Sequence, residues 1–340
     1  MLQRIRNLWH PEAFHYGHRL AHGGGQFEGW YYKVVDAEGR QPYAFIPGVF
    51  LGADAHAVIQ VLDGRSGTSA YHRFAIESFR ATPGEQDVSI AGNRFTQCGI
   101  QVDIGEDETS AKQAVRVDLA FGPWRPWPVG PLSPGVMGPY SFVPFMQCNH
   151  GITSLDHTVS GEVEIERGIT RYDGGRGYSE KDWGKGFPAG YVWTQSNHFD
   201  REGVCITASV AHIPWLTGSF RGFLIGLLLD GELLRFTTYT GTTIDRVALT
   251  DTHLVMSLHD KMHRLELDAH RTDGATLHAP YDAQMIERVA ETMTSEVAVR
   301  LSRLHDDEAI FEGVGRHGCL EVQGDLERVL DEGHVHHVSC

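Results

Sequence analysis

The sequence predicts an all-β protein built from two similar antiparallel units. Short apolar or alternating runs, closed by Gly or Asp-Gly turns, recur along the chain and are typical of strands and hairpins. The same succession of runs occurs twice, about 160 residues apart, which indicates an internal duplication. With 340 residues, 41% of them hydrophobic, the chain is long enough to bury two adjoining cores.

The strand pattern is plain in many segments, such as AVIQVLDG, AVRVDLAF, GEVEIERG, LIGLLLDG and HRLELDAH. One stretch, residues 281–304, instead repeats apolar residues at about helical spacing, with Met285, Val289 and Met293 as examples. Its second half alternates like a strand. We therefore expect one short helix, over residues 283–291.

The duplication is visible as four echoes in the same order. Trp30 precedes an acidic-Gly turn at 36–39, as Trp193 does at 200–203. VIQVLDG is echoed by LIGLLLDG, IQVDI by LELDA and GEVEI by GCLEV. A unit made of many meandering strands suits a closed or nearly closed barrel, which removes exposed edges. Two β-sandwiches are the alternative. The expected organisation is an N-terminal segment (1–24), a first barrel (25–188), a second barrel (189–330) and a mobile tail (331–340).

Composition limits the classes of binding partner that can be expected. The formal net charge is -15, with 44 acidic and 29 basic residues, and the sequence has no basic stripe. A phosphate-binding surface needs such a stripe, so nucleic acid is excluded as an expected partner. Nothing in the sequence points to an obligate protein partner.

Three features favour a cytoplasmic protein. The first residues lack the apolar core of a secretory signal, and the most apolar stretch, 213–229, is interrupted by Pro214, Gly218 and Arg221. The five cysteines form no CxxC pair and are odd in number, which fits reduced thiols. Peripheral contact with a membrane stays open, because Trp124 and Trp127 in the Pro- and Gly-rich loop 121–140 could sit at an interface. The alternative is a loop packed across a barrel end.

Two segments carry residues that are unusual for mere strands. They are FEGWYYK (27–33) and GGRGYSEKDWGKGFPAGYVWTQSNHF (174–199). Strand alternation places Trp193, Gln195 and Asn197 on one face. Such a polar and aromatic face suits a ligand cavity better than a packed core.

These motifs resemble those of the tocopherol cyclase family. The similarity rests on FEGWYYK, PFMQCNHGITSLDHTVSGEVEI, GRGYSEKDWGKGFPAGYVWTQSNHF, IPWLTGSFRGF and LHAPYD, in that order. It covers about Gln26 to Leu326. More distantly, the family resembles the carotenoid 1,2-hydratase and lipocalin-like pericyclase group, and this implies two lipocalin-like barrels.

The resemblance implies an enzyme of the intramolecular lyase type that closes a ring on a prenylated quinol. A proton is delivered to an alkene and the phenol oxygen captures the cation, so neither a cofactor nor a metal is expected. Two alternatives stay open. One is a hydratase or pericyclase acting on a terpenoid or polyketide, and the other is a carrier that binds an apolar ligand without chemistry.

Protonation of the alkene requires a carboxylic acid held protonated by an apolar pocket. Asp182 is the first candidate because it adjoins Trp183, and aromatic faces stabilise cations. Glu28 is the second candidate and Glu180 the third. The plainer interpretations are a salt-bridged turn for Asp182 and Glu180, which flank Lys181, and a structural brace for Glu28.

The expected substrate-binding residues are aromatic or polar side chains from the same motifs: Trp30, Tyr32, His150, His157, Trp183, Trp193, Gln195, Asn197 and His198. Core packing is the alternative for the tryptophans. Cys148, His150, Asp156 and His157 are metal-ligand types, but their spacing fits no zinc pattern, so no metal site is expected.

Overall fold

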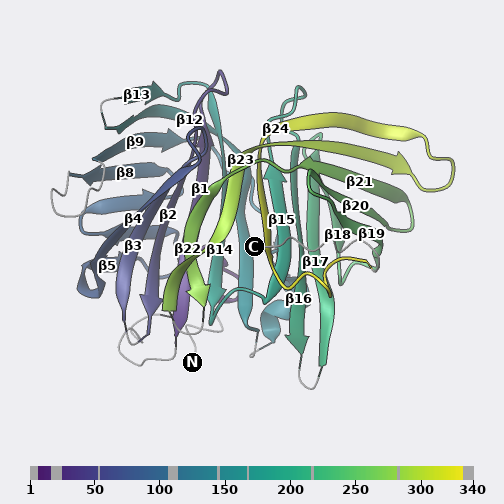
Figure 1. Ribbon diagram of the computed structural model, residues 1–340, viewed down its shortest axis with the longest axis horizontal. Helices are drawn as coiled ribbons and strands as arrows, with labels where there is room; N and C mark the ends of the chain where they lie inside the picture. The colour runs from purple at the N-terminus through teal and green to yellow at the C-terminus, as the bar shows by residue number, and fades with distance from the viewer. Residues whose placement is uncertain are drawn as a thin grey trace. The chain divides into compact units, whose positions relative to one another are not determined.

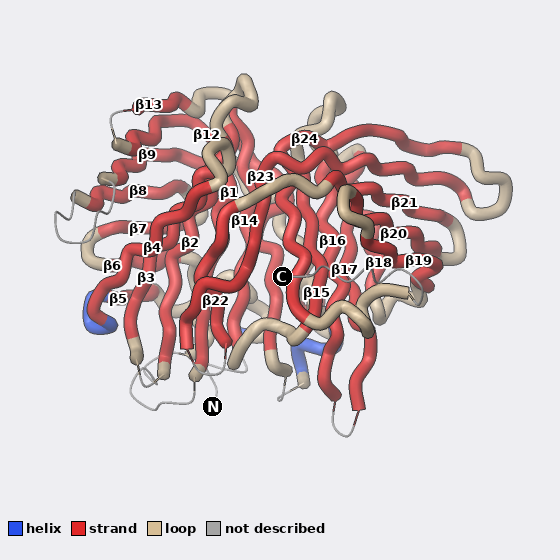
Figure 2. Tube along the Cα trace, viewed as in Figure 1, coloured by secondary structure: helices blue, strands red, loops and turns tan. Residues whose placement is uncertain are grey.

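The computed structural model describes residues 7–16, 25–52, 54–105, 114–143, 146–166, 168–215, 218–281 and 284–331. Antiparallel strands dominate it, interrupted by two short 3-10 turns, η2 (Ile76–Ser78) and η3 (Gly138–Phe142) (Figures 1 and 2). The predicted all-β, antiparallel fold is thus confirmed. In the described part of the chain, no helix is long and apolar enough to cross a membrane. The predicted mobile tail lies outside the described residues, apart from Asp331.

The chain divides into two compact units. Unit 1 comprises Met1–Phe187 together with Thr276–Arg288, and unit 2 comprises Pro188–Ala275 and Val289–Cys340. The segment 276–288 was not anticipated in unit 1. It is held there by the backbone of His278, which exchanges hydrogen bonds with the Gln60 side chain, and by the His278 ring stacked on Tyr71 at 4.0 Å.

Unit 1 is organised around one 12-stranded sheet. Its main path runs, in spatial order, through β4 (Thr68–Ala75), β3 (His56–Asp63), β2 (Pro42–Leu51), β1 (Gln26–Val35), β14 (Gly175–Gly184), β12 (Cys148–Ile165), β9 (Val115–Phe121), β8 (Gly99–Ile104), β7 (Asn93–Thr96), β6 (Asp87–Ile90) and β5 (Phe79–Ala81). β13 (Gly168–Arg171) pairs with β12, and β10 (Val129–Gly130) with β11 (Ser133–Pro134) forms a separate hairpin.

Unit 2 is organised around a 10-stranded sheet. The spatial order is β18 (Glu232–Thr237), β17 (Gly218–Leu229), β16 (Cys205–Trp215), β15 (Gly190–Ser196), β24 (Ala309–Gly324), β23 (Gln284–Arg303), β21 (His263–His270), β20 (His253–His259) and β19 (Thr243–Leu249). The tenth strand is β22 (Ala275–Tyr281), which pairs with β23 although all of it except Ala275 is assigned to unit 1.

The two sheets repeat one topology. In each, a four-stranded meander comes first, and its first strand pairs with the last strand of the sheet, β1 with β14 and β15 with β24. The Asp-Gly echo falls on the equivalent strands β3 and β17. The last two echoes are one strand out of step, since β8 corresponds to β20 and β12 to β23. Alternating strands of similar composition recur in every hairpin, so a short likeness does not identify its structural counterpart.

The predicted helix is wrong. Residues 284–291 belong to β23, and residue 283 lies outside the described residues. Apolar residues spaced by four also fall on one face of a strand, because four is a multiple of the strand period of two. Pairing of β23 with β21 and β24 decides between the two structures.

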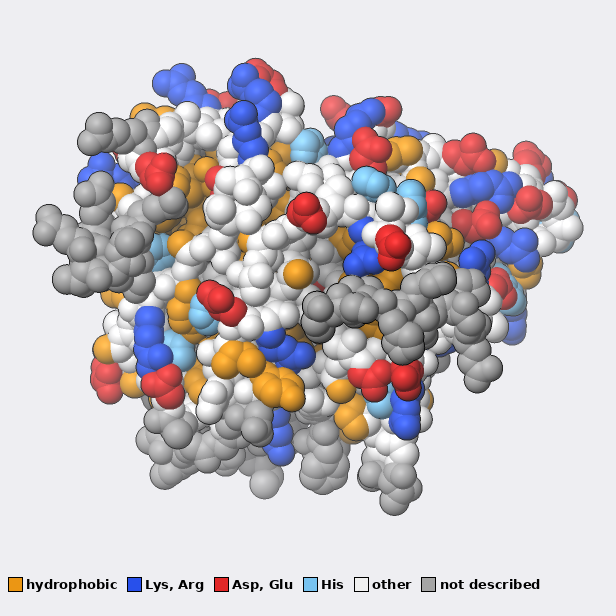
Figure 3. All heavy atoms as spheres, in the orientation of Figure 1, with side chains coloured by type: hydrophobic (Ala, Val, Ile, Leu, Met, Phe, Trp, Pro, Cys, Tyr) orange, Lys and Arg blue, Asp and Glu red, His pale blue; other side chains and the backbone are white. Residues whose placement is uncertain are grey.

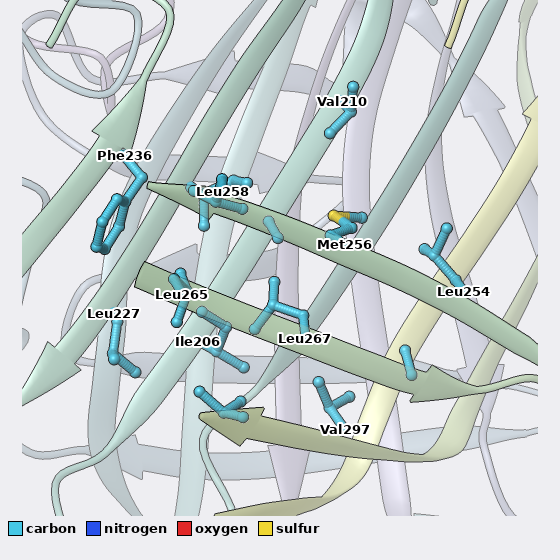
Figure 4. Packing of buried hydrophobic residues seen from close by; sticks show 14 of the residues in the cluster. Ile206, Val210, Leu227, Phe236, Leu254, Met256, Leu258, Leu265, Leu267 and Val297 are labelled. Carbon is cyan, nitrogen blue, oxygen red and sulfur yellow. The ribbon is translucent and has the colours of Figure 1, made fainter. Parts of the chain in front are cut away.

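Each unit has its own apolar core. In unit 1 the core is lined by Trp30, Tyr32 and Val34 of β1, and we call this side of the sheet its inner face. In unit 2 Ile206 and Val210 of β16 pack with residues of β20 and β21, including Met256 and Leu267 (Figure 4). On the surface drawn in Figure 3, basic and acidic side chains lie interspersed.

Candidate active site

The segment from Glu180 to Trp183 on β14 places side chains on both faces of the unit 1 sheet. On β1, Trp30 lies opposite Lys181 and Glu28 opposite Trp183. On β12, His150 lies opposite Asp182. Because successive side chains of a strand point to opposite faces, Lys181 and Trp183 lie on the inner face, and Glu180 and Asp182 on the other, which we call the outer face.

On the inner face, Glu28 and Lys181 form an ion pair whose side chains are both fully buried. The Lys181 ammonium lies 4.8 Å from the centre of the Trp30 ring and 4.6 Å from that of Trp183. Burial alone raises the pKa of Glu28, but Lys181 and His15 together bring it below its ordinary value. An ionised carboxylate held by an ammonium group is no proton donor, so this geometry argues against Glu28 as the acid.

On the outer face, four side chains form what we call the acid–imidazole cluster: His150, Tyr178, Glu180 and Asp182. His150 Nδ1 lies 2.9 Å from Asp182 Oδ1, and His150 Nε2 lies 3.7 Å from Glu180 Oε2. The Tyr178 hydroxyl donates a 2.5 Å hydrogen bond to Glu180 Oε2. The Asp182 side chain is 25% exposed and that of Glu180 8%. The cluster therefore combines two carboxylates and an imidazole, with Asp182 the more accessible acid.

The expected pairing of Asp182 with indole rings is not found. Trp183 and Trp30 lie with Lys181 on the inner face, whereas Asp182 bonds His150 on the outer face. Neighbours in a strand cannot share a face, which is the physical reason for the correction. The nearby thiol of Cys148 has its pKa raised by burial and by the charges of Asp182 and Glu180, so it stays neutral.

Two bulges in β12 separate His150 from His157. Its pairing with β14 shifts register between Ile152 and Ser154 and again before His157, and bulges re-aim side chains in this way. His157 consequently lies against Gly177, where any side chain would clash with the imidazole. Asp156 pairs instead with Arg176, with Nε 3.0 Å from Oδ1.

His157 is buried in an aromatic cluster of unit 1. Its ring stacks on Trp124 at 5.4 Å, and Nδ1 lies 3.0 Å from Ser154 Oγ. Nε2 has no hydrogen-bond partner within the described ranges, and desolvation lowers the pKa of His157 to about 3. Tyr32 lies 6.3 Å from Trp124 and accepts a 2.8 Å hydrogen bond from Gln86. These residues belong to the inner face.

The loop 121–140 does not present its tryptophans to solvent. Trp127 is 1% exposed, and Trp124 is partly buried against Tyr32 and His157. Leu132, at the tip of the β10–β11 hairpin, is 81% exposed, and Val129 of the same loop is 44% exposed. The two indoles are therefore packing residues.

In unit 2, the predicted polar and aromatic face is present on β15. Trp193 and Gln195 alternate with Val192, which belongs to the apolar core, so they lie on the opposite face. Both are buried, as is Asn197 just beyond the strand. His198 follows in a single bridge with Arg316. When the acidic-Gly turns at 36–39 and 200–203 are aligned, Trp30 corresponds to Thr194 rather than to Trp193. Trp30 therefore lies on the core face of its sheet, and Trp193 lies on the face away from the core.

A metal ion has one candidate ligand set among the described residues. The ligand atoms of His150, Glu180 and Asp182 all lie within 4.8 Å of one another. This set differs from the one weighed in the sequence. The bulges carry Asp156 and His157 away from His150, and the pairing of β12 with β14 before the bulges places two carboxylates of β14 beside it. Imidazole and carboxylate together suit a zinc-like cation.

Sequence reasoning missed Lys181, His15 and Tyr178. Alternation in EKDW could have revealed Lys181, since two acids on one face leave the lysine beside Trp183 on the other. His15 could not be found in this way, because it precedes β1 and reaches the sheet only through tertiary contacts.

The comparisons with known proteins agree with this architecture. The chain is 23% identical to a probable chloroplastic tocopherol cyclase of Oryza sativa subsp. japonica and 25% identical to a chloroplastic tocopherol cyclase of Zea mays. The alignments cover 88% of this chain and 75% and 74% of those proteins. A crystal structure of CghA with Sch210972 shares the fold, with a TM-score of 0.52, 10% identity, and coverage of 88% of this chain and 89% of that one.

The profile described as tocopherol cyclase-like matches residues 85–324, which include all of the acid–imidazole cluster. The match spans more than two thirds of the 340 residues. The chain therefore belongs to the tocopherol cyclase-like family.

Proposed function

We propose that this protein is an enzyme that closes a ring on a prenylated quinol by adding a phenol to an alkene, with Asp182 as the acid. The observation that carries the proposal is the 2.9 Å contact between His150 Nδ1 and Asp182 Oδ1 at a partly accessible position. The names of the plant relatives, both tocopherol cyclases, support the reaction type.

The first step is proton transfer from Asp182 to the alkene carbon. An apolar substrate over Asp182 would displace water from this side chain, and a neutral carboxylic acid costs less to desolvate than a carboxylate. The hydrogen bond from His150 would stabilise the carboxylate left behind, and so strengthen the acid in the transition state. The transfer breaks the O–H bond of Asp182 and forms a C–H bond, leaving a tertiary cation.

The second step is attack of the phenol oxygen on that cation, which forms the C–O bond. The phenol proton must then return to the enzyme, because the product is an isomer of the substrate. Glu180 is the proposed acceptor, oriented by Tyr178 at 2.5 Å. His150 Nδ1 faces Asp182 and Nε2 faces Glu180, so the imidazole can take this proton at Nε2 while it gives the Nδ1 proton to Asp182. Exchange of the ring protons with solvent then restores the Nδ1–H form for the next turnover.

Mass spectrometry of extracts tests the reaction. Incubation with a panel of prenylated quinols is expected to yield a product of unchanged mass and altered retention. Asp182→Asn is expected to lower kcat by about 10²–10⁴-fold, the range for a positioned proton donor, while ligand is still bound. The matched control is Asp245→Asn, because Asp245 forms an equally short 2.9 Å contact with His259 on the surface of unit 2.

The other outcomes overturn the proposal in distinguishable ways. A mass gain of one water would mean that water captures the cation and that the enzyme is a hydratase. Quinols recovered unchanged yet retained by the protein would indicate a carrier. Full activity of Asp182→Asn would remove Asp182 as the acid.

A further inference from the structure

Residues 7–16 lie against the inner face of unit 1, where they contact the fully buried ion pair of Glu28 and Lys181. Lys181 donates hydrogen bonds to the Ala13 carbonyl and to His15 Nδ1, the latter at 2.9 Å. The backbone N–H of His15 donates to both oxygens of Glu28, at 2.8 and 3.1 Å. The Trp30 indole N–H donates to the Glu12 carbonyl at 2.9 Å.

Apolar contacts complete this attachment. The Phe14 ring packs on Phe79 at 5.1 Å and on Trp30 at 6.4 Å. The His15 imidazole stacks on Trp183 with ring centres 4.3 Å apart and planes 14° apart. Detachment of residues 7–16 would therefore uncover aromatic surface at the inner face of unit 1.

The hydrogen bonds require a neutral His15. Its Nδ1 accepts from the Lys181 ammonium, so the single ring proton is on Nε2, which donates to the Asn7 carbonyl at 3.0 Å. A second proton on Nδ1 would replace this acceptor by a donor facing the ammonium group. The same proton would be buried, since the His15 side chain is 10% exposed.

We propose that residues 7–16 form a pH-sensitive clasp, which closes over the inner face of unit 1 while His15 is neutral and detaches when His15 is protonated. The proposal is independent of the reaction assigned to the outer face. It concerns a segment outside the matched family range, residues 85–324.

The ion pair allows the clasp to open without stranding a charge. Glu28 is on β1 and Lys181 on the adjacent strand β14, so the pair stays together when residues 7–16 leave. A buried charge without its partner would be strongly destabilising. Water can replace the hydrogen bonds to the clasp backbone. The attachment can thus be reversed while the sheet remains folded.

The groups around His15 set the direction of the pH effect. Burial and the charge of Lys181 lower the pKa of His15, and Glu28 opposes them with the smaller effect. Glu12, paired with His10, is the acidic residue of the clasp itself, and it acts on Lys181. In the detached segment His15 regains an ordinary pKa near 6.5. The open form therefore binds more protons, and closure is lost as the pH falls below about 6.5.

Hydrogen–deuterium exchange of the full chain, read by mass spectrometry between pH 7.5 and 4.5, tests the clasp. After correction for the intrinsic exchange rate, protection of residues 7–16 is expected to fall by up to about tenfold per pH unit below 6.5, until the pKa of the closed form is reached. Peptides from β2 and β3 should keep their protection, which separates detachment from unfolding.

Two variants complete the test. His15→Gln cannot be protonated, so its protection of residues 7–16 should be the same at pH 7.5 and 5. His56→Gln is the matched control, because His56 is also buried with a lowered pKa but lies on β3. It should follow the wild type. Equal protection of wild-type residues 7–16 at pH 7.5 and 5, or a pH dependence in His15→Gln like that of the wild type, would overturn the proposal.

Discussion

His150 and Asp182 are bonded across β12 and β14, Nδ1 to Oδ1 at 2.9 Å, on the face of the sheet that Lys181 does not share. Four consecutive residues of β14, Glu180 to Trp183, therefore take part in two different sites, an acidic cluster on the outer face and a buried ion pair on the inner face. The inner pair of Glu28 and Lys181 is buried and saturated with hydrogen bonds, whereas the outer cluster keeps an acid 25% exposed. Proton transfer is expected from the outer face.

Glu180→Gln should slow the second half of the proposed reaction. Asp182 still protonates the substrate, but the amide cannot accept the phenol proton, so product formation slows in every turnover, the first included. Rapid quenching is expected to show no burst and a kcat lowered about 10²-fold or more. A burst of about one product per enzyme, or the steady-state rate of the wild type, would exclude Glu180 as the acceptor of the phenol proton.

Zn²⁺ should inhibit the enzyme by binding His150, Glu180 and Asp182, whose ligand atoms lie within 4.8 Å of one another. EDTA is expected to reverse the inhibition. At a given Zn²⁺ concentration, Glu180→Gln should lose a smaller fraction of its own activity than the wild type loses. EDTA alone should leave the wild-type rate unchanged, because the proposed steps use only protons. Loss of wild-type activity in EDTA would instead point to metal chemistry at this cluster.

Lys181→Met should be strongly destabilising. It leaves Glu28 buried without its cation, and breaking a buried ion pair typically costs about 3–5 kcal/mol. The double variant Glu28→Gln/Lys181→Met should recover part of the loss, because no charge stays buried. Arg201→Met, which breaks an exposed pair with Asp230, is the control and should cost about 1 kcal/mol or less. Urea unfolding measures all three, and a Lys181→Met loss no larger than the control would contradict the expectation.

His157 should make unit 1 sensitive to acid. Its pKa is about 3 in the fold and near 6.5 in the unfolded chain, so the unfolded state takes up a proton first as the pH falls. Stability is therefore complete above pH 6.5 and declines below it, by about 2 kcal/mol at pH 5. His157→Asn removes the titration and should unfold with less dependence on pH over this interval. Urea unfolding at pH 7 and pH 5 measures the change in the free energy of unfolding. An equal loss in the wild type and in His157→Asn would contradict the prediction.

Gly151→Val should open the clasp at every pH. A Cβ at position 151 would lie 3.0 Å from Pro11 Cβ and 3.3 Å from the Trp183 ring, so a branched side chain pushes residues 7–16 away. Exchange protection of that segment is expected to be low at pH 7.5 as well as pH 5. Gly105→Val, at a position open to solvent, is the control and should retain the protection of the wild type.

The sequence by itself determined the fold class, the duplication and the family. Strand alternation and turn residues are local properties, so they could be recognised without coordinates. Alternation also placed Trp193 and Gln195 on one face, as the structure has them. The same rule, applied to EKDW, already separates Asp182 from Trp183.

Tertiary structure decided the rest. The bulges of β12 parted His150 from His157, and a register shift of this kind depends on the partner strand rather than on local propensity. The strand at 284–291 follows from pairing with two neighbours, since a spacing of four is compatible with both helix and strand. The bonds of His15 with Glu28 and Lys181 join residues 13 and 166 positions apart. Such long-range contacts form only when the chain folds, because loop closure and burial bring those groups together. The spacing of residues in the sequence does not predict them.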